Sequence, residues 1–387
     1  MRDFRFADFG PYTGTLRHRI LPRKVIVNVE RVYLFGRHIF HGGCNADLRM
    51  IARSAFEKEN RHADPAQAAS SFYDAHSWRR KSEMKLRVLI LGYGEMGHAM
   101  EYLLAARHDV RIWNLGTLVK GNHATLEEAV ADAQVILFCL PVNPHDEIAR
   151  RIAPHVVPDC LCLTIAKGLD ETGRTAAQIF ERVFAGKCHY GVMYGPMISE
   201  ELRAGRHGFA DAVLSDAADF AVIHALFLGS TLVCQQASDL HGRSWSVILK
   251  NVYAILFGVA DQLQLGDNLR GHLMVAALAE LSGIVQSFGG KANTPYSYAG
   301  LGDLLTTATS ADSHHHELGC KLARGEWSDI SGEGVHTLRM VEKYRLFDWR
   351  GYPLFALAHD IVSAPQTLRE RLQDYLRQLR EVERCAI

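Results

Sequence analysis

The first clear pattern begins at residue 86, where short apolar runs alternate with segments that repeat apolar residues every three or four positions. Continuous runs are typical of strands buried on both faces of a parallel sheet, and the second spacing is typical of amphipathic helices. We therefore predict strands over Leu86–Leu91, Asp109–Trp113, Val135–Leu140, Leu161–Ile165 and Gly191–Tyr194. Helices are predicted where Met96, Ala99, Met100 and Leu103 share a face, near Thr125–Asp132 and near Asp146–Ile152. This alternation predicts a doubly wound α/β domain.

Beyond about residue 235 the strand-like runs stop, and helical periodicity continues to the C-terminus. We predict helices over Trp245–Leu263, Leu269–Phe288, Leu301–Thr307, His315–Ala323, Gly334–Tyr344, Pro353–Val362 and Pro365–Val382. The chain is thus expected to end in an all-helical domain.

A glycine-rich turn separates the first predicted strand from the first predicted helix. It reads Gly92-Tyr-Gly-Glu-Met-Gly97, a G-x-G-x-x-G motif in the strand–turn–helix context that gives this motif its meaning. Glycines let the backbone approach a pyrophosphate, whose charge the helix N-terminus stabilises. The turn therefore predicts a Rossmann domain that binds NAD or NADP through Gly92, Gly94, Glu95, Met96 and Gly97. The anionic side chain of Glu95 must then point away from the phosphates.

Asn114 ends the second predicted strand, 22 residues after Gly92. This position usually holds an Asp or Glu that accepts a hydrogen bond from the ribose 2′-hydroxyl of NAD. An asparagine bonds a hydroxyl without repelling a 2′-phosphate, but no arginine follows it directly. The choice between NAD and NADP therefore stays open.

These elements divide the chain into three parts. We expect a Rossmann domain over residues 84–238 and an all-helical catalytic or substrate domain over residues 239–387. Residues 1–84 show no sustained period and carry 15 Lys and Arg against 9 Asp and Glu, a net +6, which leaves −6 for the remainder of a neutral chain. Met84 directly precedes the first strand, so we expect it to be the true start and residues 1–83 to be an over-called extension. The alternative is a small appended module.

Composition and charge narrow the class of protein. Apolar residues make up 48% and charged residues 22%, as in ordinary globular proteins, and zero net charge favours neither nucleic acid nor an anionic membrane as partner. No apolar run reaches the roughly 18–20 residues of a membrane span. The 8 cysteines form no C-x-x-C pair, which favours reduced thiols over disulfides or a zinc site. We expect a cytoplasmic protein with a small-molecule substrate.

Four polar features stand in apolar surroundings. Lys250-Asn251 lies in a buried-looking helix, Lys167-Gly168 follows a strand, Gly195-Pro196 follows another, and Asp303 begins a helix after a glycine-rich loop. Burying an amine or an amide costs free energy unless it is paired, so the first pair needs a partner. Each feature has a plainer interpretation. Lys250 can extend to solvent, Lys167 can be a solvated turn residue, Gly-Pro can be only a tight turn, and Asp303 can be an N-cap.

Taken together, the segment from about Leu86 to Arg380 resembles the soluble, cytosolic NAD(P)-dependent glycerol-3-phosphate dehydrogenases. The resemblance covers order and spacing as well as single motifs. It rests on G-x-G-x-x-G at 92–97, Lys-Gly at 167–168, Gly-Pro at 195–196 with Glu200, Leu-Lys-Asn-Val-x-Ala-Ile at 249–255, Gly-Asp-Asn at 266–268, Gly-Leu-Gly-Asp-Leu at 300–304, Gly319 with the following Lys-Leu-Ala-Arg-Gly, and Gly-Glu-Gly-Val at 332–335.

The resemblance implies a role for several residues. Lys250 would be the catalytic acid and base that protonates the ketone oxygen of dihydroxyacetone phosphate, and Asp303 would orient it. An apolar setting lowers the pKa of a lysine, which suits this role. Substrate-binding residues would be Lys167, Gly195, Asn251, Thr307, Ser313, His314 and His315, and Asn114, Lys167, His314 and Glu333 would contact the cofactor. The resemblance also implies a homodimer.

The sequence departs from the family pattern on the substrate side. The family carries Ser-Arg-Asn where this chain has Ser313-His314-His315, and Met197 replaces the serine of Gly-Pro-Ser. Tyr298 also replaces an apolar residue. A guanidinium is a permanent phosphate ligand, whereas histidine is mostly neutral at pH 7. Residues 314–316 are three adjacent histidines, but neighbours on a helix point in different directions, so we predict no metal site.

Three hypotheses follow. The first is an NAD(P)-dependent glycerol-3-phosphate dehydrogenase. The second keeps the same hydride chemistry but acts on another small hydroxy or keto compound, because the altered residues lie on the substrate side. The third is an NAD(P)-binding sensor without turnover, which would need neither Lys250 nor Asp303.

Overall fold

A computed structural model describes residues 85–114, 116–123, 125–310 and 313–385, with side chains described up to residue 381. The expectations for residues 1–83 and for a start at Met84 lie outside the described residues.

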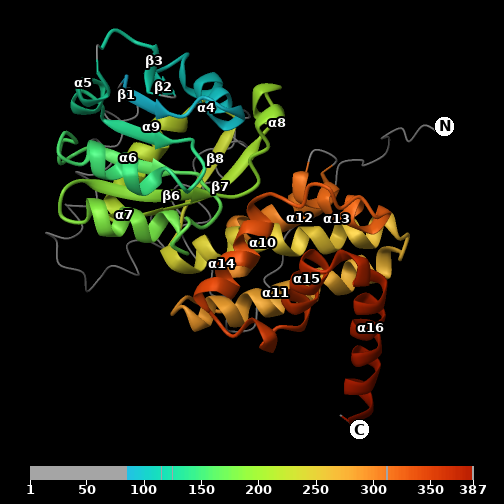
Figure 1. The fold of residues 1–387 in the computed structure, drawn as a ribbon. Coiled ribbons are helices and arrows are strands. Elements are labelled where there is room, and N and C mark those ends of the chain that lie inside the picture. Colours follow the sequence, from blue (N-terminus) through green and yellow to red (C-terminus); the bar gives the residue numbers. More distant parts are fainter. Residues whose placement is uncertain (1–84, 115, 124, 311–312, 386–387) are drawn as a thin grey trace, which may run out of the picture. The chain divides into compact units, whose positions relative to one another are not determined.

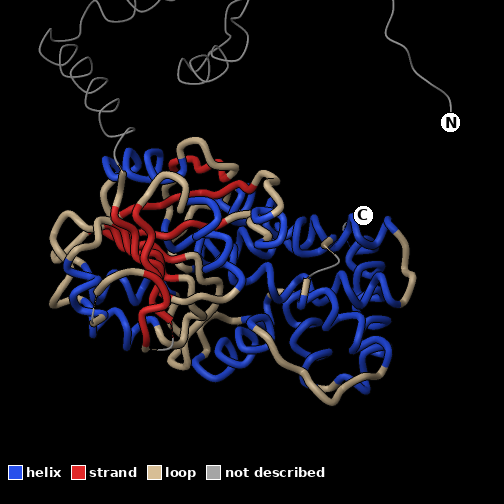
Figure 2. The backbone as a smooth tube through the Cα atoms, turned by 90° about the horizontal axis from the view of Figure 1, so that it is seen from above, coloured by secondary structure: helices blue, strands red, loops and turns tan. Residues whose placement is uncertain are grey.

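One eight-stranded sheet forms the first part of the described chain (Figures 1 and 2), with the order β3-β2-β1-β4-β5-β6-β7-β8. Strands β2, β1, β4, β5 and β6 are parallel, whereas β3 and β7 run antiparallel to β2 and β6. The predicted doubly wound α/β sheet is confirmed. The strands are β1 Arg87–Leu91, β2 Asp109–Asn114, β3 Thr117–Lys120, β4 Val135–Phe138, β5 Leu161–Thr164, β6 His189–Tyr194, β7 Gly208–Leu214 and β8 Leu232–Gln236.

Both faces of this sheet are covered by helices. Successive side chains of a strand point to opposite faces, and in β1 Val88 and Ile90 join a core that contains residues of α4 and α9. Leu89 and Leu91 join a second core, built with α5, α6 and α7. The covering helices are α4 Glu95–Leu104, α5 Leu126–Ala131, α6 His145–Ile152, α7 Ala176–Phe184, α8 Ser199–Arg203 and α9 Phe220–Phe227.

Several elements of the sheet domain were not predicted from the pattern, namely β3, β7, β8, α7, α8 and α9. β3 and β8 lie at the two sheet edges and expose most of their residues, so they lack the continuous apolar run of a central strand. β7 is buried, but Asp211 interrupts its apolar sequence. The predicted runs therefore marked the five parallel strands β2, β1, β4, β5 and β6 and missed both edge strands and β7.

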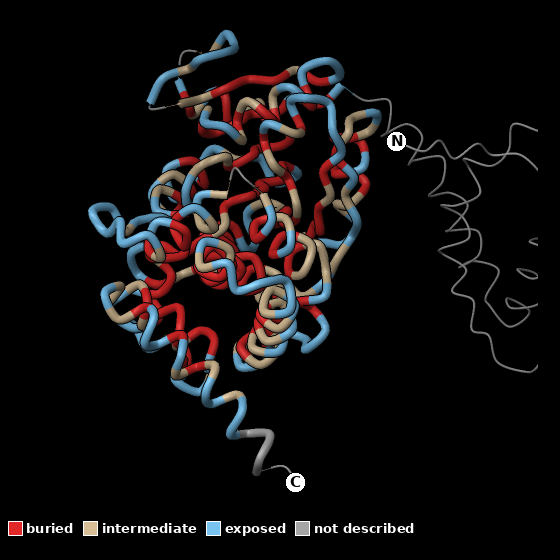
Figure 3. Tube along the Cα trace, turned by 90° about the vertical axis from the view of Figure 1, so that its right-hand side faces the viewer, coloured by how far each residue is buried: buried red, intermediate tan, exposed pale blue. Residues whose placement is uncertain are grey.

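The second part of the described chain is helical, as predicted, and its central element is α10, Leu240–Gln262. Every residue from Ser244 to Ala260 is buried, because α11, α12, α13, α14 and α15 all pack against this helix. Buried backbone fills the interior of both the sheet and the helical parts in Figure 3. The other helices are α11 Asp267–Ser287, α12 Asp303–Thr309, α13 His314–Arg324, α14 Glu333–Tyr344, α15 Pro353–Ser363 and α16 Leu368–Cys385.

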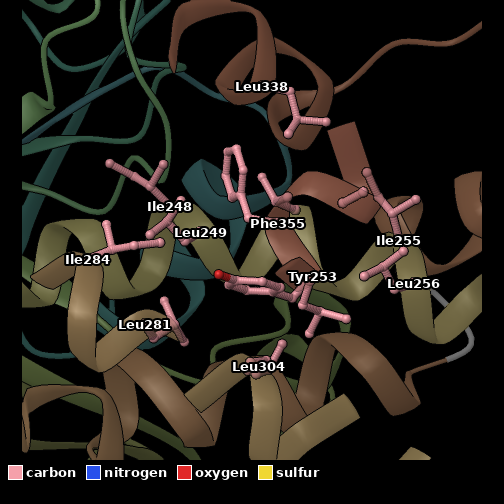
Figure 4. Close-up of a cluster of buried hydrophobic side chains, with 14 of the residues drawn as sticks. Ile248, Leu249, Tyr253, Ile255, Leu256, Leu281, Ile284, Leu304, Leu338 and Phe355 are labelled. Carbon is pink, nitrogen blue, oxygen red and sulfur yellow. The ribbon is translucent and has the colours of Figure 1, made fainter. Parts of the chain in front are cut away.

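A tyrosine–glutamate contact lies within this helical core. Figure 4 shows Tyr253 of α10 among Leu249, Leu281 and other apolar side chains. Its hydroxyl donates to Glu280 Oε2 at 3.0 Å, and the Glu280 carboxylate also accepts the first backbone N–H groups of α15. A partly buried carboxylate here completes the hydrogen bonds of a helix N-terminus.

Two glycines let α10 and α13 approach each other closely. A Cβ atom on Gly258 would lie 1.9 Å from the His316 carbonyl oxygen, and one on Gly319 would lie 2.0 Å from the Ile255 carbonyl oxygen. The backbones of the two helices are thus in direct contact, which holds the N-terminus of α13 beside the middle of α10.

Candidate functional site

The glycine turn at the C-terminal end of β1 has the geometry that the motif predicts. Gly92 has φ +95°, and a Cβ atom there would lie 2.6 Å from the Cys139 carbonyl oxygen. A Cβ on Gly97 would lie 2.4 Å from the carbonyl oxygen of Gly92, whereas one on Gly94 would meet nothing within 4 Å. Two glycines are therefore needed for the turn itself. Gly94 leaves open space at the N-terminus of α4, where a pyrophosphate can approach.

Two polar residues beside this turn have different roles. One is exposed to solvent, and the other holds the turn in place. The Glu95 side chain is 69% exposed, and its Oε2 lies 3.5 Å from Arg203 Nη1 on α8. Asn114 Oδ1 accepts the backbone N–H of Tyr93 at 3.3 Å. Asn114 thus ties the end of β2 to the glycine turn.

A largely buried group of three charges lies where the sheet meets α10. The ammonium of Lys250 donates to Asp303 Oδ1 at 3.1 Å and to Thr307 Oγ1 at 2.6 Å. The other carboxylate oxygen of Asp303 accepts from Lys167 Nζ at 2.7 Å. One carboxylate therefore bridges a lysine that follows β5 and a lysine in the middle of α10, and it joins the two parts of the chain.

Three of the plainer interpretations are wrong. The Lys250 side chain is only 7% exposed, so it does not extend to solvent. Lys167 is 23% exposed and ion-paired rather than a solvated turn residue. Asp303 is not an N-cap, because the π-helical turn Tyr298–Gly302 leads directly into α12 and Asp303 already has helical φ and ψ angles. Its carboxylate is thereby left for the two lysines.

The environment of Lys250 disfavours its charge. Burial lowers the pKa of Lys250 from 10.5 to about 8, and the positive charge of Lys167 acts in the same direction. The negative charge of Asp303 opposes both effects. Lys250 can therefore gain or lose a proton near neutral pH, as an acid–base catalyst must.

The Lys167-Gly168 turn is held by groups from three elements. Lys167 Nζ donates to the Gly195 carbonyl at 3.2 Å, and the Lys167 carbonyl accepts from Asn251 Nδ2 at 3.4 Å. The carboxylate of Glu333, at the N-terminus of α14, packs over Gly168, where an added Cβ would lie 2.1 Å from its Oε2. Burial raises the pKa of this Glu333 carboxyl. Lys167, Gly195, Asn251 and Glu333 are thus brought together.

The three adjacent histidines point in different directions, as expected for a helix. Ser313 is the N-cap of α13 and accepts the backbone N–H of His316, and His316 Nε2 lies 2.8 Å from Asp261. His314 is exposed, whereas His315 Nε2 is buried and has no hydrogen-bond partner within the described part of the chain. Burial and the nearby Lys250 lower the pKa of His315 to about 3, so its ring is neutral.

One buried ion pair near the site was missed by sequence reasoning. Asp211 of β7 is fully buried, and its Oδ2 lies 3.1 Å from Arg243 Nε on α10. An aspartate within an apolar stretch, Phe209-Ala-Asp-Ala-Val213, was the signal that could have identified it.

Two further kinds of feature are absent from the described residues. None of the helices there is long and apolar enough to cross a membrane. The same residues contain no group of three or more His, Cys, Asp and Glu side chains that could hold a metal ion.

A dinucleotide-binding sheet joined to a helical domain that buries a lysine–aspartate pair defines an NAD(P)-dependent dehydrogenase. Comparison with known proteins gives the particular family. Residues 121–217 match the N-terminal and residues 239–373 the C-terminal domain of NAD-dependent glycerol-3-phosphate dehydrogenase. The chain therefore belongs to the NAD-dependent glycerol-3-phosphate dehydrogenase family, which makes it an oxidoreductase that uses NAD or NADP.

Individual relatives agree with this assignment. The chain is 30% identical to glycerol-3-phosphate dehydrogenase [NAD(P)+] of Gloeobacter violaceus over 269 residues, which cover 67% of this chain and 86% of that one. It is 29% identical to the enzyme of the same name from Teredinibacter turnerae, covering 66% and 84%. The crystal structure of glycerol-3-phosphate dehydrogenase from Coxiella burnetii shares the fold, with a TM-score of 0.65 and 22% identity over 76% of this chain and 99% of that chain.

Proposed function

We propose that this chain interconverts sn-glycerol 3-phosphate and dihydroxyacetone phosphate, with NAD or NADP as hydride carrier and Lys250 as acid and base. The observation that carries the proposal is the position of Lys250 Nζ, buried within hydrogen-bonding distance of Asp303 and Thr307. Membership in the family supports the reaction, and the relatives named above are glycerol-3-phosphate dehydrogenases.

The hydrogen bonds of Lys250 leave one proton for the substrate. An ammonium group has three N–H donors, and Asp303 and Thr307 accept from two of them. In reduction, the third is donated to the ketone oxygen while the carbonyl carbon receives hydride, and Lys250 becomes a neutral amine. In oxidation, the neutral amine takes the proton of the alcohol. A bound nicotinamide supplies the hydride in one direction and accepts it in the other.

The residues at the glycine turn fit a dinucleotide. The open space over Gly94 receives the pyrophosphate at the N-terminus of α4, with Gly92, Met96 and Gly97 shaping the turn. Asn114 Nδ2 faces the ribose, because its Oδ1 is already bonded to Tyr93. Glu333, over Gly168, meets the cofactor between the sheet and α14.

The substrate lies beside the charged group, in contact with Lys167, Asn251 and Thr307. Lys167 is ion-paired but partly exposed, so it still presents positive charge to a bound anion. The Gly195 carbonyl fixes the direction of its ammonium. Ser313, His314 and His315 complete this side of the site at the N-terminus of α13.

A second candidate reaction is the reduction of an unphosphorylated ketone by the same residues. The neutral state of His315 favours it, because this ring provides a hydrogen bond but no charge for a phosphate. His314, in place of the family's arginine, likewise offers no permanent charge.

One experiment separates the two reactions. NADH and NADPH oxidation is followed with dihydroxyacetone phosphate and, in parallel, with dihydroxyacetone and other unphosphorylated ketones. Lys250→Met should reduce kcat by about 100-fold or more with the true substrate, the usual contribution of general acid–base catalysis, while the exposed Lys321→Met should not. Turnover of dihydroxyacetone phosphate supports the first reaction, and turnover of the unphosphorylated compounds alone overturns it in favour of the second. Undiminished kcat in Lys250→Met excludes Lys250 as the acid and base.

Two further expectations rest on family membership. We infer that the protein works as a homodimer in the cytoplasm. Sedimentation velocity of the purified chain tests the first statement, and a single species at the mass of one chain, 43.2 kDa, would contradict it. Fractionation of the native host tests the second.

A further inference from the structure

A fully buried carboxylate, Asp211, connects β7 to three other elements. Its Oδ1 accepts from Gln235 Nε2 of β8 at 2.6 Å, and its Oδ2 accepts the backbone N–H of Ala299 at 3.1 Å. Arg243 Nε of α10 lies 3.1 Å from the same Oδ2 and neutralises the charge. Burying such a pair costs desolvation energy, which an apolar pair would avoid. The hydrogen bond to Ala299 is the feature that an apolar pair could not supply.

Asp211–Arg243 is a second carboxylate–cation pair at α10, which also carries the Lys250 of the Asp303–Lys250 pair. Arg243 and Lys250 are seven residues apart, so they lie two turns apart on one face of the helix. Ala299, which Asp211 holds, is in the π-helical turn that ends one residue before Asp303. The position of Asp303 beside Lys250 therefore depends on where this turn is anchored.

Asp211 also lies beside the strand that leads to the other lysine. In the sheet it is paired with Tyr194 of β6, the residue before Gly195. The Gly195 carbonyl accepts from Lys167 Nζ, and Lys167 contacts the second oxygen of Asp303. Asp211 is thus linked to Lys250 through the turn before Asp303, and to Lys167 through β6 and Gly195.

We propose that Asp211, neutralised by Arg243, is a positioning residue for Asp303, and that its bond to Ala299 holds the Tyr298–Gly302 turn so that the carboxylate stays between Lys250 and Lys167. The proposal rests on the proposed function in so far as Lys250 is the acid and base. Asp211 itself touches neither lysine and takes no part in proton transfer.

Loss of the Asp211–Ala299 hydrogen bond has a specific electrostatic consequence for Lys250. The titratable groups that face Lys250 are Asp303 on α12, Lys167 after β5 and His315 on α13, with Glu333 of α14 over the neighbouring Gly168. Asp303 raises the pKa of Lys250, whereas burial and Lys167 lower it. If the turn relaxes and Asp303 moves away, the pKa of Lys250 falls below about 8.

The decisive variant is the double substitution Asp211→Ala with Arg243→Leu. Asp211→Ala alone leaves the largely buried Arg243 without its carboxylate and can prevent folding. The double variant removes both charges together, so its loss of stability is limited to the unpaired Ala299 N–H and Gln235 amide groups. We expect kcat to fall about 10- to 100-fold, the size of effect that follows small misplacements at a reacting centre. The midpoint of the kcat–pH profile should move to lower pH, and the KM for the cofactor should stay unchanged.

A matched control removes a different, partly buried carboxylate. Glu280→Gln alters the carboxylate that holds the N-terminus of α15 and has no bond to the Tyr298–Gly302 turn. We expect a lower Tm in this variant with the pH midpoint of the wild type. A double variant that is stable and retains the wild-type midpoint and kcat overturns the proposal, because the pair would then serve stability alone.

A direct titration keeps the inference separate from the identity of the substrate. Lysine labelled with ¹³C at Cε is incorporated, and the Lys250 signal is assigned from its loss in Lys250→Arg. A lower Lys250 midpoint in the double variant supports the positioning role even if dihydroxyacetone phosphate is not turned over, in which case only the proposed function fails. An unshifted Lys250 signal in an enzyme that does turn over the phosphate compound contradicts the positioning role.

Discussion

Lys250 and Asp303 are 53 positions apart in the chain, yet Nζ and Oδ1 lie 3.1 Å apart in a buried ion pair. Burial alone would push the lysine strongly towards its neutral form. Asp303 opposes this effect, and the outcome is a pKa of about 8. The pair thus keeps both protonation states of Lys250 within reach near neutral pH.

The pH dependence of turnover should have opposite signs in the two directions. In the proposed mechanism ketone reduction requires the protonated form of Lys250, so kcat should be full below about pH 8 and fall as the pH rises through this value. Alcohol oxidation requires the neutral amine, so kcat should rise through the same range. Measurement of kcat with saturating substrate from about pH 6 to 10 in both directions tests this. Profiles with the same sign in both directions would show that another group is titrating.

Replacement of His314 by arginine should improve the use of a phosphorylated substrate. His314 is exposed at the first turn of α13, beside the substrate side of the proposed site. A permanent guanidinium there can form charge-assisted hydrogen bonds worth about 1.5–3 kcal/mol with a phosphate, which corresponds to a roughly 10- to 100-fold lower KM for dihydroxyacetone phosphate.

His314→Gln is the matched control, since it keeps a polar side chain without adding a fixed charge. An arginine variant whose KM for the phosphate compound equals that of the glutamine variant would mean that position 314 is not part of an anion site. A KM that falls for dihydroxyacetone as strongly as for its phosphate would also contradict the account.

Acid should destabilise the protein through its buried neutral histidines. His145 donates from Nδ1 to the Pro141 carbonyl and accepts from the Thr164 hydroxyl, and burial lowers its pKa from 6.5 to about 4. Between these values the unfolded chain binds a proton that the folded chain does not. Stability is therefore lost as the pH falls from about 6.5 towards 4, by up to about 1.4 kcal/mol per pH unit for this residue.

The test is the free energy of unfolding from urea titrations at several pH values. His145→Gln should reduce the slope of the unfolding free energy against pH between about pH 6 and 4. The reduction is at most the contribution of one proton, about 1.4 kcal/mol per pH unit, whatever the stability of the variant at neutral pH. Two parallel curves would show that His145 is protonated in the folded protein. The pKa of His315 is also lowered by burial. The decline in stability should therefore be reduced in His145→Gln, but not abolished.

Local patterns predicted the central strands and the long helices because these elements bury continuous or periodic apolar residues. β1 and α10 are examples, and both lie in the interior. The edge strand β8 was missed because most of its side chains are exposed, so no apolar run marks it. Local sequence also suggested an N-cap for Asp303, which is wrong because the conformation of the turn before it depends on packing.

The composition of the site was predictable in part. Lys250 and Asn251 lie in an apolar helix, which showed that both needed polar partners. The family resemblance indicated Asp303 as the partner of Lys250. The contact of Lys167 with the same carboxylate, and the Asp211–Arg243 pair, join residues 136 and 32 positions apart. Such pairs depend on the meeting of sheet and helices, so local sequence can mark Asp211 as a charge within an apolar stretch but cannot identify its partner.

The close contact of α10 and α13 leads to a last prediction, about glycine. A Cβ at position 319 would lie 2.0 Å from the Ile255 carbonyl oxygen and 2.9 Å from the Val259 nitrogen, all backbone atoms that can separate only if the helices do. Gly319→Ala should therefore reduce the free energy of unfolding by about 1–3 kcal/mol or more, the usual cost of overpacking. It should also lower kcat, because α13 carries His314 and His315, which complete the proposed substrate site.

Gly271→Ala is the matched control. Gly271 lies within α11, is exposed, and has nothing within 4 Å of an added Cβ. Alanine has a higher helix propensity than glycine by about 0.8–1.0 kcal/mol, so this variant should be more stable than the wild type and equally active. Urea unfolding and steady-state kinetics on the two variants give opposite signs if backbone contact explains Gly319. Equal and small effects would mean that α13 can shift at no cost and that its N-terminus is not held in place by this contact.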